Sequence, residues 1–136
     1  MSPAAIRRAL LVLFGAAAVG TGIELILLGH TEDPWQWVPV VLTFSGPLVA
    51  IWYGLRRRRA SRRLFQGTMI LFVASAGVGL TLHYRSNVEF ALEMEPGARG
   101  LALAGEALTG AIPALAPGTM MLLGAIGLIA SAISED

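Results

Sequence analysis

The sequence predicts an all-α, polytopic membrane protein with four transmembrane helices and a short helical external cap between the third and the fourth. Composition is the first observation: the 136 residues are 55% hydrophobic and only 14% charged, and the mean hydropathy is +0.68. These values lie well outside the usual balance of a soluble domain. The second observation is a set of four apolar stretches, each close to the ~20 residues that cross a bilayer. We expect residues 1–136 to form a single membrane domain.

The four predicted helices are separated by a short loop, an arginine loop and a long external segment. In chain order these elements are a first helix at about 9–29, a second at about 35–55, the arginine loop at 56–63, a third helix at about 64–82, the external segment at 83–117 and a fourth helix at about 118–133. The second helix has a clear start signal: Asp33 can cap it, Pro34 suits its first position and Gln36 its third.

The arginine loop predicts the orientation of the chain. It holds six arginines, which are Arg56, Arg57, Arg58, Arg59, Arg62 and Arg63. A cluster of this density is rarely translocated, so the positive-inside rule places it in the cytoplasm. With an even number of crossings, the N- and C-termini lie on the same side, as Arg7 and Arg8 also require. We expect a multi-pass protein of the plasma membrane, the inner membrane of a bacterium, whose loop arginines contact anionic lipid headgroups at about 1 kcal/mol each.

Aromatic residues agree with this orientation independently. Trp35 and Trp37 stand at one end of the second predicted helix, and Trp52 and Tyr53 stand at the other. Aromatic side chains gather where a membrane-spanning helix meets the headgroups. The two pairs therefore predict the two interfaces of the bilayer.

Small residues recur four apart within the predicted helices, as in Ala18 with Gly22 and Ser75 with Gly79. Such pairs allow close approach of helix backbones in lipid. They indicate packing within one bundle, and they leave open a homo-oligomer or contact with a partner membrane protein.

The external segment is the least lipid-like part of the chain, and we expect function to reside there. Its sequence from Ser86 to Glu89 is typical of a capping box, and Pro96 is a stop signal. This predicts a short helix over 87–95, unless the third helix continues unbroken through the same residues. A second, amphipathic helix is expected over about 98–109.

Glu24 is the acidic residue placed deepest in a predicted span, about 7 to 8 Å from its outer end at 1.5 Å per residue. A carboxylate at that depth is costly unless it is protonated, paired or facing water. Polar side chains of the neighbouring helices are expected at similar or shallower depth. They predict a ligand or ion pathway that opens to the outside and is lined by Glu24, Thr43, Ser45, Thr81 and His83.

A second candidate site comprises His83, Glu89 and Glu93, which could hold a divalent cation. One histidine with two carboxylates is an acceptable ligand set for zinc, manganese or iron. The alternative is a solvated acidic face paired with arginine. His30 and His83 are expected on the same side of the membrane, so ligation of a haem by both is a further possibility.

Several function classes are disfavoured by the sequence. The chain has no cysteine, which removes thiolate catalysis and Cys-based metal sites. It contains no nucleophile elbow or phosphate-binding loop, so an enzymatic role stays open but is not favoured. No nucleic-acid partner is indicated, because the net charge is only +1.

The function that these patterns favour is a small, non-enzymatic membrane protein. It would bind a ligand, a cation or a partner protein at an outer-leaflet pocket and an acidic external cap. One alternative is a homo-oligomeric transporter or channel for ions or small molecules that uses Glu24. Another is a membrane metalloprotein with His and Glu ligands.

Overall fold

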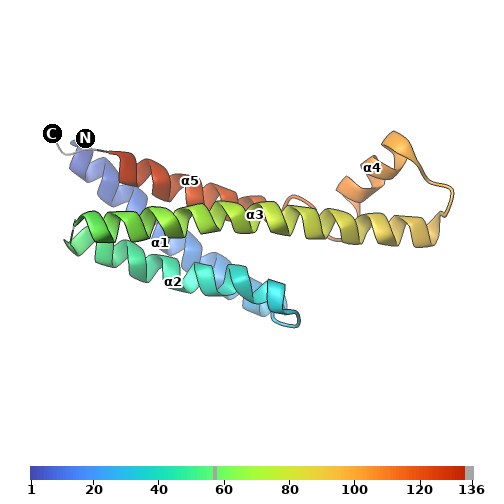
Figure 1. The fold of residues 1–136 in the computed structure, drawn as a ribbon, viewed down its shortest axis with the longest axis horizontal. Helices are drawn as coiled ribbons and strands as arrows, with labels where there is room; N and C mark the ends of the chain where they lie inside the picture. The colour runs from blue at the N-terminus through green and yellow to red at the C-terminus, as the bar shows by residue number, and fades with distance from the viewer. Residues whose placement is uncertain (57, 134–136) are drawn as a thin grey trace.

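The structure is a computed structural model that describes residues 1–56 and 58–133. Within these residues the chain is all-helical, and the elements are α1 (Pro3–Leu27), α2 (Pro34–Arg56), α3 (Arg59–Met94), α4 (Gly100–Thr109) and α5 (Gly118–Ala132). Helix α1 packs against α2 and α5, while α3 packs against α2, α5 and α4. The first half of α3 thus completes a four-helix bundle. Its second half extends beyond the bundle and carries α4 (Figure 1).

Three helices, α1, α2 and α3, are long and apolar enough to cross a membrane. Helix α5 is equally apolar, but its 15 residues span about 22 Å, less than the ~30 Å of hydrocarbon. Large apolar side chains on the outside of the bundle, such as Val12, Leu48, Leu71 and Leu122, are more than half exposed. Continuous apolar exposure of this kind is typical of a surface covered by lipid or by a partner protein.

The start of α2 confirms the signal read from the sequence. The backbone N–H of Trp35 donates to Asp33 Oδ1 at 2.8 Å. The side-chain oxygen of Gln36 accepts from the backbone N–H groups of Glu32 and Asp33 at 2.9 and 3.2 Å. Since the free N–H groups of a helix start need such partners, these side chains determine where α2 begins.

Helix α3 is one unbroken helix through Met94, so the separate short helix expected over 87–95 is wrong and the alternative of a continuous third helix is confirmed. No proline or glycine interrupts the chain between Leu80 and Pro96, so the local capping pattern does not end the helix. Its 36 residues span about 54 Å, far more than a bilayer requires. The helix expected over about 98–109 is confirmed as α4, which begins at Gly100 with a positive φ of 62°.

Aromatic rings fill the core of the bundle. The ring of Phe14 meets those of Phe65 and Phe72 edge-on, with centroids 6.0 and 5.5 Å apart. Tyr53 stacks on Phe65 at 5.0 Å and is buried, so the expectation that it faces headgroups is wrong. Rings this bulky need small partners: a Cβ on Gly46 would lie 2.8 Å from Phe72. Gly46 therefore allows close packing between the helices of the bundle itself.

The bundle has two distinct ends. We call one the arginine end, where the start of α1, the end of α2, the start of α3 and the end of α5 lie together (Figure 1). We call the opposite end the histidine end, where the loop at 28–33 joins α1 to α2. From the histidine end, the second half of α3 and α4 project together as one arm.

Candidate functional site

Both histidines of the chain meet at the histidine end. Gly29 adopts a left-handed conformation with φ of 71°, and the backbone N–H of His30 donates to the carbonyl oxygen of Leu25 at 2.9 Å. This turn places the His30 ring against that of His83 on α3, with centroids 6.0 Å apart and planes inclined at 60°. Two nitrogen-bearing rings from distant parts of the chain therefore share one place.

The orientation of His83 is fixed by the connector between α4 and α5. Its Nδ1 lies 3.0 Å from the carbonyl oxygen of Pro113. Because a carbonyl oxygen only accepts, we assign the proton to Nδ1, which leaves Nε2 with a free lone pair. Partial burial, and secondly the nearby His83, lower the pKa of His30 below its ordinary value of 6.5. His30 is therefore largely neutral at pH 7.

The connector, residues 110–117, follows one stripe of α3. Gly79, His83 and Asn87 are spaced four apart, so they lie on one face of the helix. Successive residues of this stripe contact the connector at successive helical turns. Gly79 lies against Pro117, His83 against Pro113, and Asn87 bonds to Ile112. The connector is thereby attached to α3 at three levels, and it continues the line of α5 towards the arm.

Asn87 is the strongest of these attachments. Its side chain is buried, and its Nδ2 donates to the carbonyl oxygens of Ala107 at 2.8 Å and Ile112 at 2.7 Å. Its Oδ1 accepts from the backbone N–H of Ile112 at 3.2 Å. Gly110 allows this fit, because a Cβ there would lie 2.7 Å from the Asn87 side chain. One buried amide therefore joins α3, the end of α4 and the connector.

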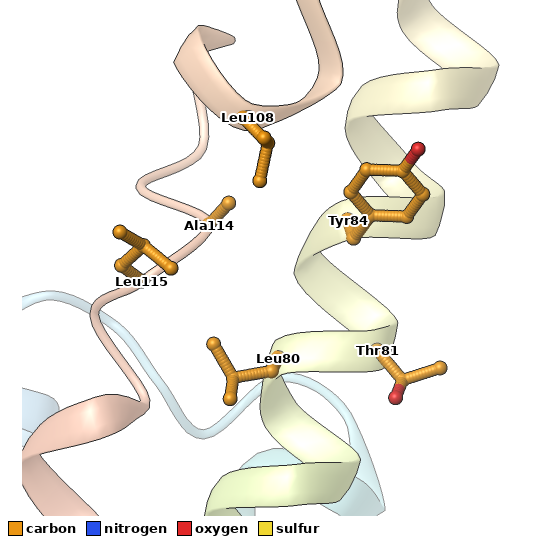
Figure 2. A pocket seen from close by; sticks show the side chains of 6 residues that line it. All are labelled: Leu80, Thr81, Tyr84, Leu108, Ala114 and Leu115. Carbon is orange, nitrogen blue, oxygen red and sulfur yellow. The ribbon is translucent and has the colours of Figure 1, made fainter. Parts of the chain in front are cut away.

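A shallow, open groove of about 290 Å³ lies between α3 and the segment 108–115. Figure 2 shows three side chains from α3 on one side of it, and one from α4 with two from the connector on the other. Hydrocarbon dominates this lining, and its hydroxyl groups belong to Thr81 and Tyr84. The lining residues are Leu80, Thr81, Tyr84, Leu108, Ala114 and Leu115.

The five residues expected to form a pathway are not gathered around one cavity. Thr43 is fully buried, whereas Glu24 is exposed one turn from the end of α1. The hydroxyls of Thr43, Ser45 and Thr81 each donate to a carbonyl of their own helix at 2.7–2.9 Å. Thr81 reaches the groove, and His83 contacts His30 instead. These polar groups are thus divided between the core and different surfaces of the molecule.

His83, Glu89 and Glu93 lie on the single helix α3, where spacing separates them. At 100° and 1.5 Å per residue, Glu89 is rotated about 120° from His83 and lies about 9 Å further along the axis. Within residues 1–56 and 58–133, no three His, Cys, Asp or Glu side chains are placed to hold a metal ion. Any metal bound to this part of the chain would need ligands from solvent or from another molecule.

Of the arginines expected in a loop, Arg56 ends α2, whereas Arg59, Arg62 and Arg63 lie in the first turns of α3, at the arginine end (Figure 1). Arg7 is buried, in contrast to Arg8. Arg57 and the C-terminal residues 134–136 lie outside the described residues. The arginines of this cluster that the structure describes are all exposed: Arg56, Arg58, Arg59, Arg62 and Arg63.

Two contacts of the candidate site were missed by reasoning from the sequence. Asn87 was interpreted as part of a capping box, although its position four residues after His83 on one helical face was a usable signal. For His30 the sequence suggests only ligation of a haem together with His83. No local pattern marks either contact, because both depend on how α3 packs against distant segments.

Comparison of the chain with protein families, with curated proteins and with solved structures finds no match. The class that the fold defines is therefore stated from the structure alone: an all-helical bundle protein with three helices that could cross a membrane.

Proposed function

We propose that this chain is a non-enzymatic integral membrane protein that binds the apolar chain of an amphiphile, such as a fatty acid or an isoprenoid lipid, in the groove between α3 and the segment 108–115. The observation that carries the proposal is the position of this apolar groove at the histidine end of the bundle. It combines a hydrocarbon lining with polar groups close by.

The proposal places the arginine end in the cytoplasm and the histidine end at the outer leaflet. The arginines before Leu64 mark one interface, because guanidinium groups stay out of hydrocarbon. About 20 residues of α3 then cross the bilayer and bring His83 to the opposite interface. The remaining part of α3, about 16 Å up to Met94, stands outside with α4.

The fourth crossing combines α5 with the connector. Helix α5 alone is too short, but Pro117 lies against Gly79 and the connector continues along α3 to the level of His83. Irregular backbone is tolerated at membrane depth where protein covers it. In this arrangement the turns at 113–120 are covered on one side by α3, and their N–H groups bond to nearby carbonyls.

An amphiphile suits the groove better than a wholly polar ligand does. The side chains of Leu80, Leu108 and Leu115 offer apolar contact, and burial of apolar surface contributes about 25 cal/mol per Å². The groove opens at the depth where lipid chains meet their headgroups. Tyr84 is placed to contact a polar head while the chain occupies the groove.

Binding is favoured over transport by the same geometry. A polar route through the bundle needs hydroxyl and carboxyl groups that face one another. Instead, Thr43 is buried with its hydroxyl bonded to its own helix, and Glu24 is exposed on the outside of α1.

Photo-cross-linking tests the proposed ligand. The full-length protein in lipid nanodiscs is incubated with a diazirine-labelled fatty acid, irradiated, digested and mapped by mass spectrometry. We expect cross-links concentrated on the groove residues and reduced at least threefold in Leu108→Gln. Leu101→Gln is the matched control, because Leu101 lies on the same helix, is 92% exposed and does not line the groove.

Labelling that is spread evenly over the lipid-facing surface, including Leu48 and Leu122, would contradict the proposal. Equal loss in the Leu101 and Leu108 variants would contradict it too, because it would indicate general association of α4 with lipid. Cross-links to a co-purifying protein at Leu108 and Leu115 would instead identify the groove as a protein contact.

A further inference from the structure

The two imidazoles at the histidine end form a pair that the amphiphile proposal does not use. The chain has only two histidines, and the fold brings their ring centroids to 6.0 Å. They come from different segments: His30 follows the end of α1, whereas His83 lies in the middle of α3. Both side chains remain partly exposed, so solvent reaches the pair.

The hydrogen bond of His83 gives it the form of a metal ligand. Donation from Nδ1–H to the carbonyl oxygen of Pro113 fixes the ring and leaves the Nε2 lone pair available. Metal-bound histidines in proteins almost always donate their other ring N–H to a carbonyl, a carboxylate or water in this way. The connector therefore already supplies the carbonyl acceptor that orients such a ligand.

The separation of the rings also fits one shared ion. With metal–nitrogen bonds of about 2.0–2.1 Å, two imidazoles on one ion have centroids about 5 to 6.4 Å apart, depending on the angle at the metal. The observed 6.0 Å lies within this interval.

We propose that His30 and His83 form a bis-imidazole site for a borderline divalent transition-metal ion, with Cu²⁺ the tightest and Zn²⁺ weaker. Water completes the coordination, since the described residues provide no group of three metal-binding side chains. Imidazole suits Cu²⁺ and Zn²⁺, and affinity rises towards Cu²⁺ along the divalent series. Ca²⁺ and Mg²⁺ are not expected to bind at this site, because they require oxygen donors.

An ion at this position ties the loop at 28–33 to α3. Through the bond between His83 and Pro113, it also stiffens the connector that leads to α4. The site is distinct from the set of His83, Glu89 and Glu93, and glutamate variants separate the two possibilities.

The test is a Cu²⁺ titration of full-length protein purified with a tag that contains no histidine. We expect one Cu²⁺ per chain by calorimetry and an electron paramagnetic resonance spectrum split by two nitrogens. His30→Ala and His83→Ala should each weaken binding at least tenfold and leave one nitrogen coupling at most. The double variant Glu89→Gln/Glu93→Gln is the control and should bind like the parent.

His83→Ala also removes the hydrogen bond to Pro113. His30→Ala tests the metal site without this second effect, because the His30 ring makes no hydrogen bond within the described residues. Gel filtration and circular dichroism establish that each variant is folded. Absence of binding by the parent overturns the proposal. The proposal is also overturned if folded His30→Ala binds Cu²⁺ with an affinity within threefold of the parent. Loss of Cu²⁺ binding in the glutamate double variant overturns it as well.

Discussion

Replacement of Asn87 by alanine is expected to release α4 from α3 while the bundle stays folded. The substitution removes three hydrogen bonds, to the carbonyl oxygens of Ala107 and Ile112 and from the N–H of Ile112. Each is worth about 0.5–1.5 kcal/mol net. Water at the edge of the arm can replace part of this loss, so we expect about 2–3 kcal/mol. The opened arm should become roughly 30- to 140-fold more populated, at 1.4 kcal/mol per factor of ten.

The absence of cysteine makes this opening measurable. In an Ala107→Cys background the thiol replaces a fully buried side chain, so a maleimide reaches it only when α4 opens. The labelling rate should rise in proportion to the opened population when Asn87→Ala is added. Ser86→Ala is the matched control, because Ser86 is the exposed neighbour. If the labelling rates of Ala107→Cys with and without Asn87→Ala agree within threefold, Asn87 does not hold α4 closed.

Three further predictions concern packing, pH and orientation. Gly124→Ala should lower the midpoint of thermal unfolding in detergent, because its Cβ would lie 2.7 Å from the Met69 carbonyl oxygen. Overpacking of this kind costs about 1–3 kcal/mol. The control Gly67→Ala, with open space at the Cβ, should leave the midpoint unchanged. In the presence of a chelator, stability should fall as the pH drops from about 7 through 6.5, because the lowered pKa of His30 means that the unfolded chain binds the proton more readily. A His30→Ala variant with the same pH profile would contradict this assignment. In intact cells an impermeant maleimide should label Ala102→Cys but not Ala60→Cys, both exposed positions, and the reverse result would overturn the proposed orientation.

Much of the fold was predictable because its signals are local. Long apolar runs predicted α1, α2 and the first part of α3, and Asp33 with Pro34 predicted the start of α2 correctly. The end of α3 was not predictable from a capping pattern alone. Ser86 and Glu89 can cap a helix, but they are equally compatible with a helix interior when no residue there breaks the preceding helix. Here the breaker comes only at Pro96.

The candidate site was less predictable because its contacts join distant segments. Apolar patterns place His30 and His83 at one end of the bundle, but they do not fix the rotation of α3 about its axis. That rotation decides whether the two rings meet. Asn87 bonds to backbone atoms of Ala107 and Ile112, and backbone atoms leave no trace in a pattern of residue types. The small size of Gly110 is the one local sign of that contact.

The proposed groove and the proposed metal site share one structural element, the connector. Ala114 and Leu115 line the groove, and their neighbour Pro113 accepts the hydrogen bond that orients His83. A ligand that widens the groove must displace this segment and so change the position of the His83 ring. An ion held by His30 and His83 must in turn restrict the groove. If either ligand alters the affinity for the other, the change in binding free energy is equal in both directions, since coupling between two binding sites is reciprocal.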